Sequence, residues 1–103
     1  MDVFHPRKLT QIALYHLEEA VLDVLFKARA EGNPFLQPTD ISELLDIPKT
    51  QLGGADYAIV FGVLDRLASK ELIRQAAPTQ RKPWGLTNKG IENRIVKYNT
   101  NIR

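Results

Sequence analysis

The segment of residues 57–73 reads Tyr57-Ala-Ile-Val-Phe-Gly-Val-Leu-Asp-Arg-Leu-Ala-Ser-Lys-Glu-Leu-Ile73, and the rest of the predicted fold is arranged around it. Its first eight residues, 57–64, are apolar or small, and taken alone they are compatible with a buried strand. The spacing of Val60, Val63, Leu64 and Leu67, however, continues into a charged segment, where a strand would have ended. The stretch therefore predicts a helix, for which Asp56 is the expected N-cap.

A β-hairpin and a final helix are expected after this helix. Two short strands are predicted over 73–76 and 83–86, joined by a polar loop with a basic tip. Trp84 and Leu86 are two residues apart, so both side chains should face the core. Thr87 is the expected cap of a last helix that directs Ile91, Ile95 and Tyr98 inward, and residues 99–103 are expected to fray.

The segment before the central stretch predicts two more helices. In the first, apolar residues recur at three- and four-residue steps, which places them on one face: Leu14, Leu17, Val21, Leu25 and Ala28. This helix is expected to begin near Thr10 or His16, after an N-terminal arm over 1–9. It should end at Gly32-Asn33-Pro34, where glycine can adopt a left-handed cap conformation and proline cannot continue the helix.

The second helix is short. Phe35-Leu36-Gln37 is expected to pair as a brief strand before it. Thr39 or Asp40 is the expected cap, with Glu43 three residues after Asp40 in the spacing of a capping box, and Pro48 should close the helix.

Composition bounds the class of protein. A chain of 103 residues with 44% hydrophobic and 25% charged residues predicts one globular domain over 1–103, with its core over about 16–96. There is no cysteine, no apolar run of membrane-spanning length and no charged-then-apolar leader. A cytoplasmic protein is expected, with no metal and no cofactor.

The charge is unevenly distributed along the chain. Residues 1–71 contain seven Lys and Arg against eleven Asp and Glu, a balance of −4, whereas residues 72–103 contain seven against the single Glu92, a balance of +6. A basic C-terminal third can supply phosphate contacts. Uneven charge also arises by chance in small domains, so the asymmetry alone does not decide for nucleic acid.

The predicted order of elements resembles the winged helix-turn-helix family of DNA-binding domains, closest to the multiple-antibiotic-resistance and phenolic-acid-repressor type regulators. Three stretches carry the resemblance beside the helix of 17–25: Thr39-Asp-Ile-Ser-Glu-Leu-Leu-Asp-Ile47, Val63-Leu-Asp-Arg-Leu-Ala-Ser-Lys-Glu-Leu-Ile73 and Trp84-Gly-Leu-Thr-Asn-Lys-Gly90. The resemblance implies an α+β, mainly α fold, with a three-helix core, a two- or three-stranded wing and a C-terminal helix. It also implies a homodimeric transcriptional regulator that binds double-stranded DNA.

In the family, the third helix enters the major groove. Carried over to this chain, the groove-facing residues are Asp56, Tyr57, Ala58, Phe61, Gly62 and Asp65. None belongs to the residue types that usually read bases, and two are carboxylates, which phosphates repel. Glu71 also stands where the family usually has glycine before the wing. If the backbone there is left-handed, glutamate is strained in that conformation and glycine is not.

Two interpretations of the third helix therefore remain open. The helix is either a well-buried central helix, or it uses Tyr57 and Phe61 as an interface to another protein chain. Under the first interpretation, DNA contact depends on the basic residues in and beside the hairpin: Arg74, Arg81, Lys82 and Lys89. A charged hairpin tip can also simply be solvated.

No pattern in the sequence indicates an enzyme. The two histidines, His5 and His16, are eleven residues apart, and Gly53-Gly54 lacks the Lys-Ser/Thr that a phosphate-binding loop requires. Asp40, Glu43 and Asp46 are better explained by helix capping and solubility than by metal or acid–base chemistry.

Overall fold

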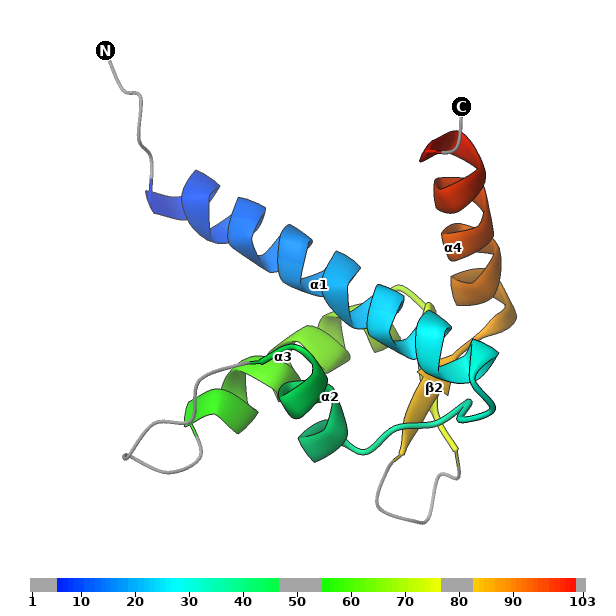
Figure 1. Cartoon of the computed structure of the whole chain (residues 1–103). Coiled ribbons are helices and arrows are strands. Elements are labelled where there is room, and N and C mark those ends of the chain that lie inside the picture. The colour runs from blue at the N-terminus through cyan, green and yellow to red at the C-terminus, as the bar shows by residue number, and fades with distance from the viewer. Residues whose placement is uncertain (1–5, 47–54, 77–82, 102–103) are drawn as a thin grey trace.

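The structure, a computed structural model, describes residues 6–46, 55–76 and 83–101, with side chains described for 10–46, 59–76 and 83–99. Within these ranges the chain forms a mainly helical fold with a small antiparallel sheet, as predicted (Figure 1). The elements in chain order are α1 (Pro6–Ala30), α2 (Pro38–Leu44), α3 (Ala55–Ser69), β1 (Ile73–Gln75), β2 (Trp84–Leu86) and α4 (Asn88–Asn101).

Helix α1 is longer than predicted. It begins at Pro6 rather than near Thr10 or His16, so the expected arm over 1–9 is helical from residue 6. Proline suits the first turn of a helix because its fixed φ is helical and its missing N–H is not needed there. The predicted end is confirmed: Gly32 has φ 99°, and Asn33 N–H donates to the Ala28 carbonyl at 2.8 Å in a Schellman motif.

Helix α2 begins two or three residues earlier than predicted. The N-cap is Gln37 rather than Thr39 or Asp40, and Pro38 is the first helical residue. Asp40 serves instead as the reciprocal partner, because its carboxylate accepts the Gln37 backbone N–H at 3.3 Å. The helix ends at Leu44, and Asp46 adopts φ 55° just beyond it. Pro48, the expected terminator, lies outside the described residues.

Helix α3 confirms the helical interpretation of the central stretch. Val60, Val63, Leu64 and Leu67 are all 0–1% exposed. Asp56 is the second residue of the helix and not its N-cap. The C-terminal end is a second Schellman motif, in which Leu72 N–H donates to the Leu67 carbonyl at 3.0 Å.

The sheet is small and has a specific order. β1 and β2 pair antiparallel with Ile73 opposite Leu86 and Arg74 opposite Gly85, and each strand is one residue shorter than predicted on its loop side. The expected strand at 35–37 is a single bridge, in which the backbone groups of Leu36 and Trp84 exchange two hydrogen bonds of 2.8 Å. Leu36 therefore lies beside β2, on the side away from β1.

The core lies where α1, α3 and the sheet meet, and Trp84 and Leu86 face it as predicted, each 8% exposed. One polar group there lacks a partner: the buried indole N–H of Trp84 has no acceptor in the described part of the chain. An unsatisfied buried donor of this kind destabilises a fold by about 1–3 kcal/mol. The apolar contacts of the Trp84 ring therefore have to outweigh that cost.

Helix α4 is capped as predicted, since Thr87 Oγ1 accepts the Gly90 N–H at 3.1 Å. Its inward face differs from the prediction. Ile91 packs on the core and Tyr98 faces α1, where the centre of its ring lies 5.5 Å from that of the Phe26 ring, but Ile95 is 45% exposed while Arg94 is only 1% exposed. Arg94 is buried because Glu19 and Asp23 of α1 face it and accept its hydrogen bonds. Residues 99–101, expected to fray, remain helical.

Candidate nucleic-acid interface

The basic residues predicted to bind DNA are only partly described. Arg81 and Lys82, at the predicted hairpin tip, lie outside the described residues. Arg74 is exposed on β1, where Nη1 donates to the Gln75 carbonyl at 3.3 Å and the guanidinium lies 5.1 Å from the centre of the Phe35 ring. These contacts orient Arg74 but leave its charge without a carboxylate partner among the described residues.

Lys89 is engaged in closing the end of α3. Its ammonium group donates to the Lys70 carbonyl at 3.0 Å. Thr87 adds two more contacts, because its hydroxyl donates to the Glu71 carbonyl at 2.6 Å and its N–H to the Leu72 carbonyl at 3.0 Å. A positive group at a helix C-terminus satisfies carbonyls that have no partner within the helix. Lys89 therefore has a structural role, whether or not it also contacts DNA.

The described part of the predicted recognition face is apolar and acidic. Phe61 is 43% exposed, and Gly62 and Asp65 are also exposed. Ile59, which no sequence pattern indicated as exposed, is 50% exposed on the same helix. Asp56, Tyr57 and Ala58 lie in α3, but their side chains are outside the described set. The face thus presents hydrophobic contact area rather than groups that read bases.

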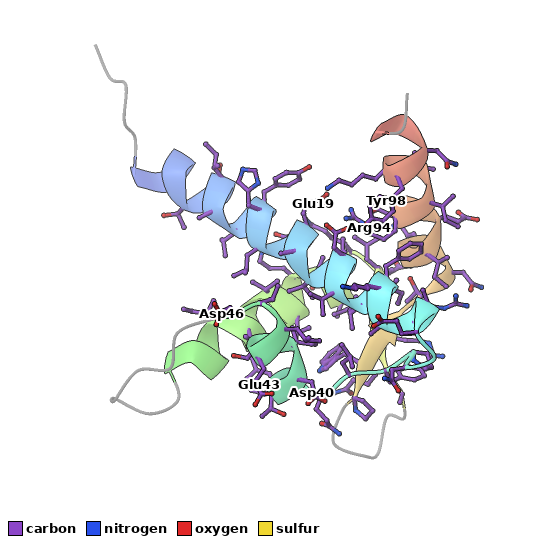
Figure 2. The ribbon with its side chains drawn as sticks, in the orientation of Figure 1. Glu19, Asp40, Glu43, Asp46, Arg94 and Tyr98 are labelled. Atoms are coloured by element: carbon purple, nitrogen blue, oxygen red, sulfur yellow. The ribbon has the colours of Figure 1, made fainter. Side chains whose placement is uncertain are left out.

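Helix α2 adds negative charge beside α3. Asp40, Glu43 and Asp46 are exposed, and Figure 2 shows them on α2 and just beyond its end, away from the side chains between α1 and α4. Carboxylates near a phosphate backbone oppose binding unless cations outnumber them. Contact with DNA through α2 would therefore have to overcome this repulsion.

Arg66 of α3 and Lys70, just beyond the end of α3, pair with a carboxylate of α1 while remaining partly exposed to solvent. Glu18, only 3% exposed, accepts Arg66 Nε at 2.8 Å and Lys70 Nζ at 2.5 Å. Burial alone would raise the pKa of the Glu18 carboxyl, but the hydrogen bonds and charges of Lys70 and Arg66 outweigh burial and lower it. These contacts fix α3 to α1. No sequence pattern indicated them, because Glu18 is separated from both partners by about fifty residues.

A second polar cluster joins α1 to α4, as Figure 2 shows. Arg94 donates to Asp23 at 2.7 Å and to Glu19 at 2.9 and 3.0 Å, and Lys97 also pairs with Glu19. Burial would lower the pKa of Arg94, yet its hydrogen bonds to Asp23 and Glu19 raise it overall. The Tyr98 hydroxyl donates to Asp23 at 2.9 Å. The sequence contained one indication of this cluster, the carboxylates at positions 19 and 23, which are four residues apart and so share a helix face. This spacing does not identify the residues that pair with them.

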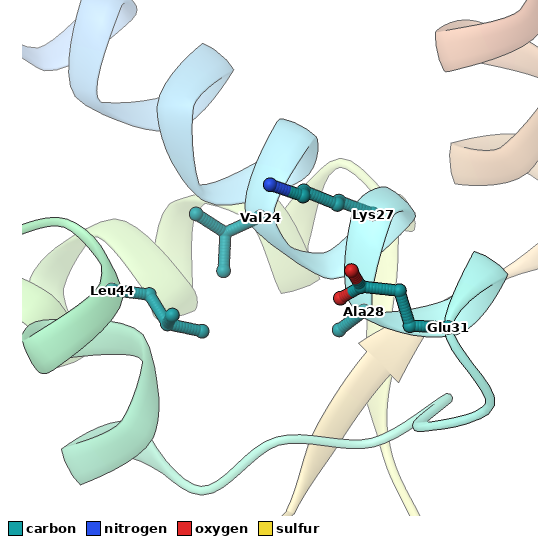
Figure 3. A pocket seen from close by; sticks show the side chains of 5 residues that line it. All are labelled: Val24, Lys27, Ala28, Glu31 and Leu44. Carbon is teal, nitrogen blue, oxygen red and sulfur yellow. The ribbon is translucent and has the colours of Figure 1, made fainter.

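Between α1 and α2 lies a cavity of about 180 Å³ (Figure 3). Val24, Ala28 and Leu44 provide its apolar surface, and Lys27 and Glu31 its charged groups. Ligand pockets in proteins usually measure about 300–1,000 Å³. This cavity is below that range, so it does not indicate a small-molecule site.

In comparisons with known proteins, no family model, no curated protein and no solved structure matches this chain. None of the described helices is both long and apolar enough to cross a membrane. Across residues 6–46, 55–76 and 83–101, no group of three or more His, Cys, Asp or Glu could hold a metal ion. Function therefore has to be inferred from the geometry of the chain itself.

Proposed function

We propose that this protein is a winged-helix DNA-binding protein, a transcriptional regulator that contacts the phosphate backbone through its basic hairpin. The observation that carries the proposal is the pairing of Leu36 with Trp84. This bridge attaches the segment before α2 to the second hairpin strand, and so fixes the hairpin beside the α2–α3 pair. The elements follow in the order helix, short strand, two helices and hairpin, and the short strand pairs with the hairpin. In this arrangement a winged helix presents one helix and one hairpin to a duplex.

The charge of the hairpin region supports backbone contact rather than base reading. Residues 73–86 contain three basic residues and no Asp or Glu, a balance of +3, while the described recognition face has no basic residue. Binding of this kind is dominated by the release of counterions and depends weakly on sequence. Modest discrimination between DNA sequences is therefore expected.

The test replaces Arg81 and Lys82 together with alanine and measures binding of several duplex sequences by fluorescence anisotropy at a series of salt concentrations. Affinity should fall to a similar extent for all sequences, and the slope of log K against log salt should become shallower by roughly two, one for each phosphate that is no longer neutralised. Lys27→Ala is the matched control, because Lys27 is an exposed cation on α1. Equal salt slopes for the double variant and the wild type would reject the role of the hairpin.

A homodimer is part of the proposal. The first ten residues of α1 with described side chains, 10–19, include exposed Ile12 and Tyr15, and the second half of α4 exposes Ile95 and Val96. Both helix ends project beyond the core in Figure 1. Because isolated helical segments are marginally stable in water, packing against a second copy would account for their length. Ile12→Ser with Ile95→Ser should yield a monomer in sedimentation velocity, with Thr39→Ser as a surface control.

The exposed apolar groups of α3 favour a second candidate function, a protein-interaction module. Ile59 and Phe61 are 50% and 43% exposed beside the acidic residues of α2. If the module binds protein through α3, Tyr57→Ala with Phe61→Ala should dissociate a complex or oligomer without unfolding the chain. If the same variant leaves assembly intact but weakens duplex binding, α3 faces DNA and the second candidate is rejected.

A further inference from the structure

We propose that the cavity between the C-terminal end of α1, the outer face of the hairpin and the start of α4 binds the phosphate group of a small organic phosphate monoester. The cavity measures about 470 Å³, within the range of ligand pockets. Arg29 and Arg74 line it from two different elements, and Asn88 adds an amide from the first residue of α4. This site is separate from the predicted hairpin tip and from the exposed face of α3.

The charges of the cavity are not balanced by the protein. Four arginines have described side chains. Arg66 and Arg94 are ion-paired to Glu18 and to Glu19 with Asp23, respectively. The other two, Arg29 and Arg74, form no ion pair with a described carboxylate, and both line this cavity, whose described lining contains no Asp or Glu. Two guanidinium groups around one cavity without an internal counter-charge favour an anion, and their planar forks match phosphate oxygens.

Contacts with the segment beside the hairpin hold the Arg74 side chain in place. A Cβ on Gly85 would lie 2.6 Å from Phe35 Cδ1, so the absence of a side chain lets the Phe35 ring lie against β2. The Arg74 guanidinium in turn lies 5.1 Å from the centre of that ring. A cation–π contact of this kind already restricts the arginine side chain, so less conformational entropy is lost when it binds a ligand. Nε and Nη2 of Arg74 have no described hydrogen-bond partner, so both remain free to donate.

The rest of the lining indicates what is attached to the phosphate. Pro34, Leu86 and Ile91 provide apolar surface beside the arginines. A free inorganic anion would leave this surface in contact with water, whereas a compact apolar group would cover it. The preferred ligand is therefore a monoester with a small apolar or aromatic body, for which phenyl phosphate is a suitable probe.

The experiment titrates the full chain with phenyl phosphate, inorganic phosphate and phenol at matched ionic strength, followed by ¹H–¹⁵N NMR and calorimetry. Phenyl phosphate should bind saturably and more tightly than either fragment, with shifts at the backbone amides of 29, 74 and 88. Arg29→Gln and Arg74→Gln should each weaken binding about tenfold, the typical effect of losing a hydrogen bond to a charged group. Lys27→Gln is the matched control, because it removes the same charge from the same last turn of α1 but does not line the cavity.

Three outcomes would overturn the proposal. The first is the absence of saturable binding by the wild-type protein at millimolar phenyl phosphate. The second is binding by the two arginine variants that is as tight as binding by Lys27→Gln. In the third outcome, both variants lose affinity for a short DNA duplex while phenyl phosphate does not bind, which would assign the arginines to the DNA backbone. Arg29 is exposed on α1, so Arg29→Gln keeps the test decisive even if Arg74→Gln fails to fold.

Discussion

Arg94 of α4 lies with its guanidinium 2.7 Å from the Asp23 carboxylate of α1, although the two residues are 71 positions apart in the chain. The arginine is 1% exposed and the Asp23 side chain 40%, so the pair is buried on one side and hydrated on the other. Glu19 also accepts Arg94, Lys97 pairs with Glu19 and Tyr98 donates to Asp23, so five side chains join the two helices. Ion pairs therefore hold α4 against α1 together with the ring contact between Phe26 and Tyr98.

Replacement of Arg94 by methionine should destabilise the protein strongly. Methionine keeps much of the volume but leaves Asp23 without its cation, while Glu19 keeps only its pair with Lys97. Loss of one partner of a buried ion pair costs about 3–5 kcal/mol, and the lower end applies because Asp23 is partly hydrated. Urea unfolding measures the change. Arg29→Met, which removes an exposed arginine, should change stability by less than about 0.5 kcal/mol; similar losses in both variants would refute a special role for Arg94.

Stability should fall on acidification. The pKa values of Glu18 and Glu19 are held below their ordinary value of 4.5, because hydrogen bonds and charges from their basic partners outweigh burial. Lowered folded-state pKa values mean that the stabilisation is complete above pH 4.5 and is lost as the pH falls through the folded-state values. Urea midpoints measured from neutral pH down to about pH 3 should decline mainly in the acidic part of this range.

The Glu19→Gln variant separates this effect from general acid denaturation. It should be less stable at neutral pH and lose less stability than the wild type on acidification, because one of the two shifted groups is absent. Parallel curves for the variant and the wild type would show that Glu19 does not contribute to the pH dependence.

Two helix glycines should respond to alanine in opposite directions. A Cβ at Gly90 would overlap with the Leu72 carbonyl oxygen, which α4 approaches at its first turn. A Cβ at Gly62 would meet nothing within 4 Å. Gly90→Ala should therefore destabilise the fold by about 1–3 kcal/mol, and Gly62→Ala should stabilise it by about 0.5–1 kcal/mol through lower chain entropy in the unfolded state. Thermal unfolding by circular dichroism compares the two, and destabilisation by both would contradict the open space at Gly62.

Glycine at position 71 should stabilise the protein. Glu71 has φ 62°, a conformation that costs about 1–2 kcal/mol for a residue with a Cβ and little for glycine. Part of that gain is offset because glycine is more flexible in the unfolded state, so an increase of about 0.5–1 kcal/mol is expected. Ser69→Gly, two residues earlier in the right-handed part of α3, is the control and should destabilise. A loss of stability in Glu71→Gly would show that the Glu71 side chain has a role that outweighs the strain.

The local pattern of the sequence determined the elements and their ends. The spacing of Val60, Val63 and Leu67 was sufficient for α3, Gly32 for the end of α1, and Thr87 for the start of α4, because periodicity and capping depend on neighbours within a few residues. The start of a helix was less well predicted where several neighbouring polar residues could each serve as the N-cap. The N-cap of α2 is Gln37, whereas the sequence favoured Thr39 or Asp40.

Which side chains are available for function depends on contacts that form only when the helices pack together. Position alone could not show that Lys89 closes the end of α3, that Arg66 and Lys70 hold Glu18, or that Arg94 rather than Ile95 is buried. These partners are from about twenty to more than seventy residues apart, and their pairing depends on how the helices cross. The central stretch 57–73 thus determined a helix and the turn that leads into the hairpin. Which of its side chains remain exposed depends on the packing of α1 and α2 against α3, because burial and charge pairing depend on distant parts of the chain.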